Sequence, residues 1–134
     1  MACHQIIYAS RPFGFDDASL NGILTEARRY NAEHDITGAL ICRPDLYLQL
    51  LEGPKEIVES LYRRIVDDNR HVEVEQLLSR AVDRRMFPDW AMLHDPAQSW
   101  LWSAEEVSDG AIKRASKDEI VAVFERSAKD AAEH

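Results

Sequence analysis

The stretch Tyr47-Leu48-Gln49-Leu50-Leu51-Glu52-Gly53 decides how this chain folds. Nearly every residue in it is apolar, and a continuous apolar run indicates a strand covered on both faces, whereas strict alternation indicates one face in water. One neutral amide, Gln49, interrupts the run. A buried primary amide needs partners for two N–H donors and a carbonyl acceptor. The group that hydrogen-bonds Gln49 is therefore expected to reveal the function.

Length and composition exclude several classes of protein. With 134 residues, 46% of them hydrophobic, the chain can form one domain with a substantial core. No apolar run approaches the roughly 18 residues that span a bilayer, and a signal peptide is not expected. The net charge of -8 argues against a nucleic-acid or anionic membrane surface, since both require a basic face. Neither the two cysteines nor the histidines have metal-ligand spacing. A cytoplasmic protein without a metal site is expected.

Hydrophobic periodicity and turn residues predict the order of the elements. The expected strands cover residues 5–10, 36–42, 47–53, 72–81 and 90–93. One long helix is expected to begin at Asp16 or Asp17 and to reach Asn31, and a second to begin at Pro54 and to close at 67–69. Two Ser-x-x-Glu capping boxes predict C-terminal helices at 103–110 and 116–131.

This order predicts an α+β fold, a ferredoxin-like βαββαββ sandwich. Its mixed five-stranded sheet is expected to carry the two main helices on one face and the C-terminal helices on the other. Strands two and three are expected to form an antiparallel hairpin around the turn at 43–45. Leu48 and Leu50 make the second face of the central strand apolar as well. The helix at 116–131 is the remaining element that can cover that face.

Several polar side chains converge on the groove expected between the two main helices. Tyr8 and Gln49 lie at the centres of their strands, and the two-residue period can place both on the groove side. Asn31 ends the apolar stripe of the first helix, while Arg64 and Asp68 lie one turn apart on the second. A phenol, two amides, a guanidinium and a carboxylate around an apolar slot would suit a planar heterocycle with carbonyls and ring nitrogens.

With these residues in place, the chain resembles the BLUF family of blue-light sensors using flavin over roughly residues 4–94. The ordered set of motifs carries the resemblance, and no single motif does. The motifs are Ile6-Ile7-Tyr8-Ala9-Ser10; Asn31 with Ile36-Thr37-Gly38; Leu48-Gln49-Leu50-Leu51-Glu52-Gly53; Arg64 with Asp68-Asn69-Arg70-His71; and Arg85-Met86-Phe87-Pro88-Asp89-Trp90-Ala91-Met92. Tyr30, Tyr47 and Ala91 depart from the usual pattern of the family.

The resemblance implies a non-covalently bound flavin, FAD in the first place and FMN as the alternative. The residues that it implies for flavin binding are Ile23, Asn31, Gln49, Arg64, Ile65, Asp68 and His71. Ile23 and Ile65 would flank the ring system, and Asn31 would bond its pyrimidine edge. Residues 1–95 are expected to form this flavin-binding core, and residues 96–134 a helical cap of the same domain.

The implied photoactive residues are Tyr8, Gln49, Trp90 and Met92. A light-excited flavin is a strong oxidant, to which Tyr8 supplies an electron and, through Gln49, a proton. When both return, the amide settles with exchanged hydrogen bonds, by rotation or as the imidic tautomer, and absorption shifts reversibly to the red. Trp90 and Met92, on one face of the fifth strand, would sense Gln49 and reposition the C-terminal helices. Output would reach an unidentified downstream protein partner, or act through self-association.

Two other classes of function stay open. An enzyme on a similar layout, such as an acylphosphatase, would require a glycine-rich anion loop ending in Arg after the first strand. Here that loop holds Gly14 alone, and Arg11 precedes it. A flavin-less regulatory module could bind a partner through the acidic surface, although the intact pair of Tyr8 and Gln49 argues against it. The sequence favours a short photoreceptor that is not an enzyme and carries no attached effector domain.

Overall fold

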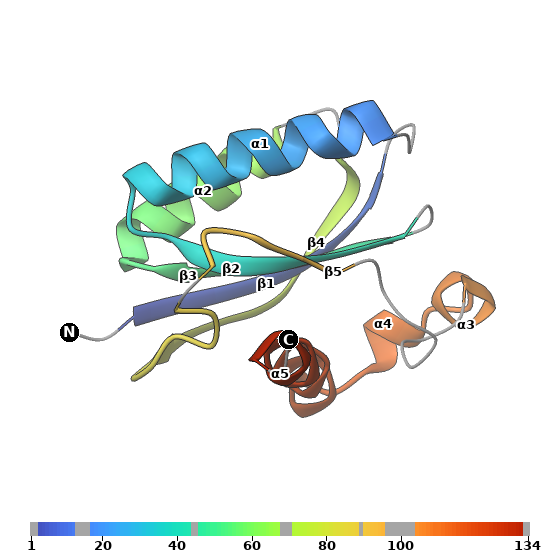
Figure 1. Ribbon diagram of the computed structural model, residues 1–134. Helices are drawn as coiled ribbons and strands as arrows, with labels where there is room; N and C mark the ends of the chain where they lie inside the picture. Colours follow the sequence, from blue (N-terminus) through green and yellow to red (C-terminus); the bar gives the residue numbers. More distant parts are fainter. Residues whose placement is uncertain are drawn as a thin grey trace.

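A five-stranded sheet forms the middle layer of the computed structural model, in the order β4-β1-β3-β2-β5 (Figure 1). The structure describes residues 3–12, 17–43, 46–67, 71–88, 90–95 and 104–132. The strands are β1 (Cys3–Pro12), β2 (Thr37–Arg43), β3 (Leu46–Gly53), β4 (His71–Val82) and β5 (Leu93–Asp95). The helices are α1 (Asp17–Glu33), α2 (Lys55–Val66), α3 (Ala104–Ser108), α4 (Ala111–Arg114) and α5 (Lys117–Ala132).

The sheet is mixed, as predicted. β1 pairs antiparallel with both β3 and β4, β2 pairs antiparallel with β3, and β5 runs parallel to β2. All eight residues of β3 are buried, which confirms that the apolar stretch is a strand covered on both faces. The hairpin of β2 and β3 is confirmed as well. The α+β fold predicted from the order of the elements is therefore correct.

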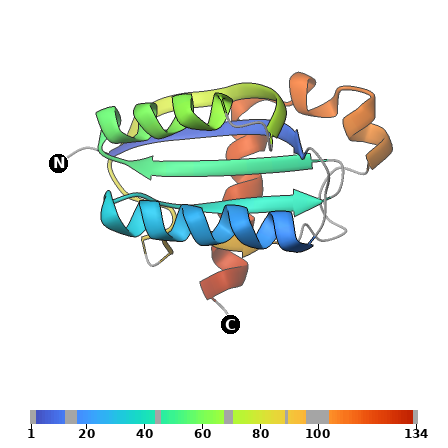
Figure 2. The same ribbon diagram turned by 90° about the horizontal axis from the view of Figure 1, so that it is seen from above.

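Side chains alternate along β3 between two separate hydrophobic cores. Tyr47 and Leu51 pack with residues of α1 and α2, whereas Leu48 and Leu50 pack with residues of α5. Figures 1 and 2 show the corresponding layers, with α1 and α2 on one face of the sheet and α5 crossing the other. The helix at the C-terminus therefore covers the second face of the central strand, as predicted.

The C-terminal helices differ in detail from the prediction. The helix expected at 103–110 ends at Ser108, and α4 follows after Gly110, whose φ of 89° is accessible to glycine at little cost. α5 confirms the predicted helix, and its capping box is formed. The Glu119 N–H donates to Ser116 Oγ at 3.1 Å, and the Ser116 N–H to Glu119 Oε1 at 3.5 Å. Ser103, the first residue of the other predicted box, lies outside the described residues.

The fifth strand was predicted wrongly at 90–93. β5 begins at Leu93, because the residues before it form a turn that bonds β2 at Gly38 without continuing the ladder. The Trp90 N–H donates to the Phe87 carbonyl at 3.3 Å, and the Trp90 carbonyl accepts from the Gly38 N–H at 3.1 Å. This turn takes Trp90 out of the ladder. Among the described residues, no helix is long and apolar enough to cross a membrane.

Candidate functional site

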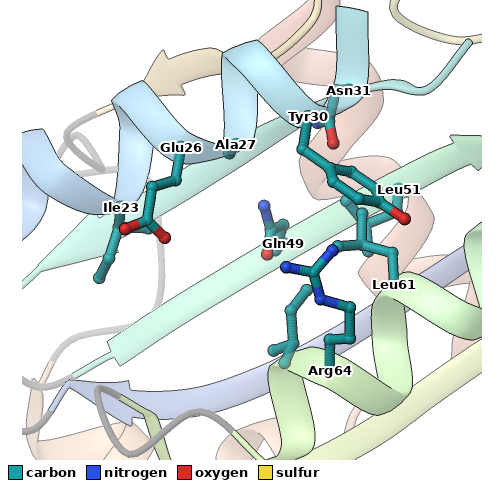
Figure 3. A pocket seen from close by; sticks show the side chains of 10 residues that line it. Ile23, Glu26, Ala27, Tyr30, Asn31, Gln49, Leu51, Leu61 and Arg64 are labelled. Atoms are coloured by element: carbon teal, nitrogen blue, oxygen red, sulfur yellow. The ribbon is translucent and has the colours of Figure 1, made fainter. Parts of the chain in front are cut away.

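A cavity of about 140 Å³ lies between α1 and α2, with β3 as its floor (Figure 3). Five residues that line it were predicted to bind a cofactor: Ile23, Asn31, Gln49, Arg64 and Ile65. They come from α1, β3 and α2, so the fold brings together residues that are far apart in the sequence. Apolar walls with a few polar groups suit a small planar ligand.

Two further predicted cofactor-binding residues are not placed at the cavity. Asp68 lies outside the described residues, and so does its predicted pairing with Arg64. His71 is placed only as the first residue of β4, opposite Pro12. The Arg64 guanidinium lies over the ring of Tyr30, 4.7 Å from the ring centroid, in a cation–π contact that links α2 to α1.

The side-chain amide of Gln49 has one strong and one weak hydrogen-bond partner. Tyr8 lies directly opposite Gln49 in the pairing of β1 with β3, and both side chains are buried. The Tyr8 hydroxyl donates to Gln49 Oε1. The Gln49 amide nitrogen donates to the sulfur of Met92 at 3.4 Å, and a thioether is a weak acceptor. Since a phenol can also accept from an amide N–H, the pair has two hydrogen-bonding arrangements available.

The hydrogen bonding of the Asn31 side chain indicates whether the cavity suits a flavin. Its side-chain amide nitrogen donates to the Ala91 carbonyl at 2.8 Å, which fixes the orientation of the amide. Its Oδ1 is buried and has no hydrogen-bond partner among the described residues. Leaving a buried acceptor unpaired costs about 1–3 kcal/mol. The pyrimidine edge of a flavin carries one ring N–H between two carbonyls, so the residues present fit that group.

Trp90 and Met92 were expected on one strand face, and that expectation is wrong. Met92 is buried and contacts Gln49, whereas Trp90 is 42% exposed and lies before β5. Side chains of α1 donate hydrogen bonds to two backbone carbonyls just before β5. Ala91 accepts from Asn31, and Met92 accepts from Arg28 Nε at 3.2 Å. Met92 is therefore the member of the predicted pair that contacts Gln49.

A second phenol lies beside Tyr8. The rings of Tyr8 and Tyr62 are 5.6 Å apart, with a tilt of 54°. Burial raises the pKa of the Tyr62 phenol above its ordinary value, and the carboxylate of Glu75 raises it further. Tyr62 therefore stays protonated throughout the neutral range and adds no charge next to Tyr8.

Sequence reasoning assigned no binding role to half of the cavity lining, namely Glu26, Ala27, Tyr30, Leu51 and Leu61. For α1, helical spacing could have identified Glu26 and Ala27, because residues three and four positions after Ile23 lie on the same helix face. For Leu51, the alternation of side chains along a strand could have done the same, because Leu51 lies two residues after Gln49 and therefore on the same face. Among the described residues, no group of three or more His, Cys, Asp or Glu side chains could hold a metal ion.

Comparison with known proteins agrees with this geometry. Residues 3–93 match the sequence model of the BLUF family, described as sensors of blue-light using FAD. Over 88 residues the chain is 39% identical to the photoactivated adenylate cyclase subunit beta of Euglena gracilis, covering 65% of this chain and 10% of that protein. Over 61 residues it is 41% identical to the blue light- and temperature-regulated antirepressor BluF of Escherichia coli K12, covering 46% of this chain and 15% of that protein.

The fold extends this similarity over nearly the whole chain. The dark-state structure of BlrB, a BLUF protein, superposes with a TM-score of 0.77 at 26% identity and covers 96% of both chains. The curated relatives are much longer, since this chain spans only 10% and 15% of the two named above. The match over residues 3–93, together with a cavity that fits a flavin, shows that the chain belongs to the BLUF family of flavin-binding blue-light sensors.

Proposed function

We propose that this chain senses blue light through a hydrogen-bond switch at Gln49. One observation carries the proposal, namely that the buried amide beside the cavity is held by a phenol on its oxygen and, within the described part of the chain, only by a thioether on its nitrogen. A strong bond and a weak bond on one amide allow it to exchange partners at low cost. The bound flavin supplies absorption of blue light and, once excited, a strong oxidant.

The chain's own residues divide the remaining work. Tyr8 would give up an electron to that oxidant and pass its proton to it along the hydrogen bond through Gln49. When both return, Gln49 settles either rotated or as the imidic tautomer, with the phenol bond rearranged and the bond to Met92 released. A new donor then faces the ligand, which lowers the excitation energy slightly. Because no covalent bond to the cofactor forms, the change reverses in the dark.

Asn31, Ile23 and Ile65 are the proposed binding residues with the clearest support. The unpaired Asn31 Oδ1 would accept the ring N–H of the flavin, while the two isoleucines, one on each helix, would flank its ring system. Arg64, together with Asp68 and His71, would line the polar end. We infer FAD in preference to FMN, in agreement with the family description. Mass spectrometry of the chromophore released by denaturation tests this choice.

The absorption spectrum before and after a blue pulse tests the function. We expect a flavin band that shifts slightly to the red and recovers in the dark. Gln49→Leu and Tyr8→Phe should keep the band and lose the shift, because each removes one partner of the switch. A flavin band without a shift in the wild-type protein would contradict the switch. A protein that takes up no flavin when FAD is added would favour the flavin-less regulatory module.

The output is proposed to be a contact between protein chains. Two curated relatives are named as a cyclase subunit and an antirepressor, and both names imply a response carried beyond the light-sensing domain. We infer that residues 96–134 cap the flavin-binding core within the same domain and change their packing after illumination. The partner is either an unidentified protein or a second copy of this chain. Light-scattering in the dark and under blue light separates these two.

A further inference from the structure

The segment from Arg85 to Met92, described at residues 85–88 and 90–92, connects the two hydrophobic cores of the molecule. Near its start, Phe87 belongs to the core under α5, where its ring meets Phe124 edge-on with centroids 6.4 Å apart. At its end, Met92 belongs to the core under α1 and α2 and contacts Gln49. Figure 1 shows the segment leaving β4 on the α5 side of the sheet and rising to β5. A displacement of this segment would therefore change side-chain packing on both faces of the sheet.

The carboxylate of Glu52 binds the start of this segment. Glu52 is completely buried, and its two oxygens each accept from a different backbone N–H. The donors are Met86, at 2.8 Å from Oε1, and Phe87, at 2.6 Å from Oε2. Side chains of the sheet complete the shell, with Gln5 Nε2 at 3.3 Å and the Thr37 hydroxyl at 3.2 Å. A buried carboxylate with this many donors is a strong and specific tether.

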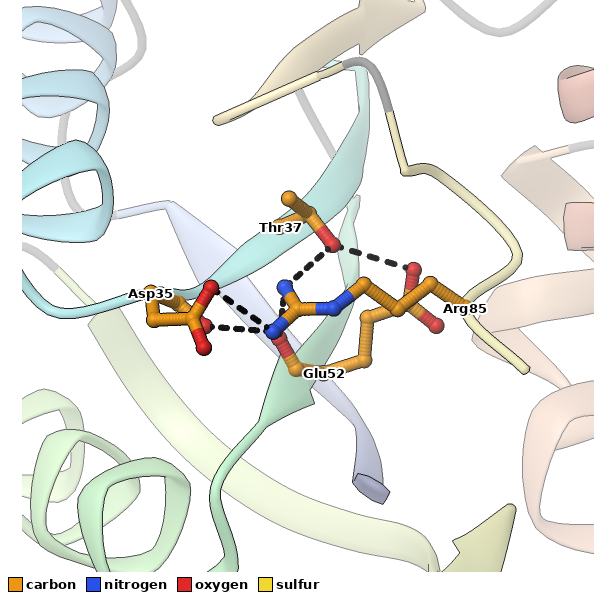
Figure 4. A network of polar contacts seen from close by, with 4 residues as sticks. All are labelled: Asp35, Thr37, Glu52 and Arg85. Carbon is orange, nitrogen blue, oxygen red and sulfur yellow. Dashed lines mark hydrogen bonds and ion pairs between the residues drawn. The ribbon is translucent and has the colours of Figure 1, made fainter. Parts of the chain in front are cut away.

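Arg85 supports the same attachment from the other side (Figure 4). Its guanidinium donates to Thr37 Oγ1 at 3.0 Å and to the Asp35 carbonyl at 2.8 Å. It also forms an ion pair with the Asp35 carboxylate at 3.0 Å. The Thr37 hydroxyl thus links the guanidinium to the Glu52 carboxylate. The connection before β2 and the end of β3 both hold the segment where it passes beneath the sheet.

We propose that Glu52 is a positioning residue for the light switch. Gln49 and Glu52 lie three positions apart on β3 and therefore face opposite sides of the sheet. One contacts the end of the segment through Met92, and the other binds its start. By fastening Met86 and Phe87, Glu52 sets where Met92 meets Gln49 and gives a rearrangement at Gln49 a route to α5. This role rests on the proposed function of Gln49.

Glu52→Gln tests the role with almost no change in shape. Two N–H groups point at two different oxygens, so an amide can accept from one and must place its own NH₂ against the other. The exposed Glu125→Gln on α5 makes the same chemical change away from the network and is the matched control. Thr37→Val is a milder second variant, which keeps the carboxylate and removes the hydroxyl link to Arg85.

Two readouts are needed, both on the flavin-loaded protein. In the dark, the amide protons of Met86 and Phe87 should exchange at least tenfold faster in Glu52→Gln than in the wild type and the control. After a blue pulse, the rate of dark recovery should change at least threefold in the same variant. Thr37→Val should move both readouts in the same direction by less, and it decides the question if Glu52→Gln does not fold.

Each failure has a distinct meaning. Unchanged exchange at Met86 and Phe87 would show that Glu52 does not hold the segment. Faster exchange with unchanged recovery would make Glu52 a purely structural residue and overturn its role in the switch. If the wild-type protein binds flavin but shows no shift, the proposed function fails together with that role. A wild-type protein that shifts, with a Glu52→Gln variant that behaves identically, overturns only the inference about Glu52.

Discussion

At the scale of single residues, the site is built on hydrogen-bonding groups that are incompletely satisfied. Gln49 has a phenol on one end and a thioether on the other, and Asn31 has a paired nitrogen with an oxygen that no described residue hydrogen-bonds. Both lie against the same cavity. Buried amides are normally satisfied, since an unmet bond costs about 1–3 kcal/mol. These deficits mark the places where a ligand adds bonds.

Asn31→Ala should weaken flavin binding about tenfold, which corresponds to about 1.4 kcal/mol, the range of one hydrogen bond in a buried site. It should also lower the free energy of unfolding by about 1 kcal/mol, because the bond to the Ala91 carbonyl is lost. Titration of the apoprotein with FAD, followed by fluorescence quenching, measures the first effect. Asn21→Ala, at an exposed position of α1, is the control. Equal affinities in both variants would contradict the role of Asn31.

The pKa of Tyr62, raised by burial and by Glu75, makes stability depend on alkaline pH. Above a pH of about 10, the phenol of the unfolded chain loses its proton while that of the folded protein keeps it. The contribution of Tyr62 is therefore complete below that pH and is lost as the pH rises through its folded-state pKa. Tyr62→Phe should flatten this decline, as measured by urea denaturation at a series of pH values. An unchanged slope would contradict the assignment.

At the scale of elements, β2 and β3 approach each other closely at Gly38. A Cβ atom added at Gly38 would collide with the Leu50 carbonyl oxygen, so the two strands meet where only glycine fits. The Gly38 N–H also binds the Trp90 carbonyl and holds the segment before β5. The same segment carries Met92, so this contact connects β2 to the partner of Gln49.

Gly38→Ala should lower the free energy of unfolding by about 3 kcal/mol, because the methyl group meets backbone that cannot move aside. Gly22→Ala is the matched control, since a Cβ there meets nothing within 4 Å. That change should stabilise α1 by up to about 1 kcal/mol. Urea denaturation of both variants gives the comparison. Similar effects at the two positions would contradict the proposed close approach.

At the scale of the whole molecule, the two cores are separate, and few elements connect them. The sheet is shared, and the segment from Arg85 to Met92 runs from one core to the other. Phe87 meets Phe124 of α5, and the carbonyls of Ala91 and Met92 accept from side chains of α1, so this segment contacts a helix on each face of the sheet. Because packed cores have discrete arrangements, a small change at Gln49 can alter how α5 is held.

Illumination should therefore change hydrogen exchange in α5. We expect amides from Ile120 to Phe124 to exchange severalfold faster in the lit state, because loosened contacts at Phe87 make local opening less costly. Mass spectrometry under continuous blue light, compared with darkness, measures this. Gln49→Leu under the same illumination is the control for heating and light damage. Identical protection in light and dark would rule out α5 as the route of output.

The sequence by itself determined the layered fold and allowed Tyr8 and Gln49 to lie on the same side of the sheet, while their pairing was implied by the resemblance to the family. The fold and this placement depend on short periods: alternation along strands of a few residues, and apolar residues three or four apart along helices. The continuous apolar run from Tyr47 to Leu51 required two covered faces, and the elements on either side left one way to supply them. Local pattern was sufficient because each strand needed only its nearest partners in the sheet.

Only the tertiary structure decided the path of the segment from Arg85 to Met92. It made Met92 the partner of Gln49, left Trp90 exposed, and gave the Glu52 carboxylate its two backbone donors. The partners lie 34 to 43 positions apart in the chain. This segment has no periodicity to predict its course, since turns and bends interrupt it. Its position follows from which buried groups still need hydrogen bonds after the sheet and helices have packed.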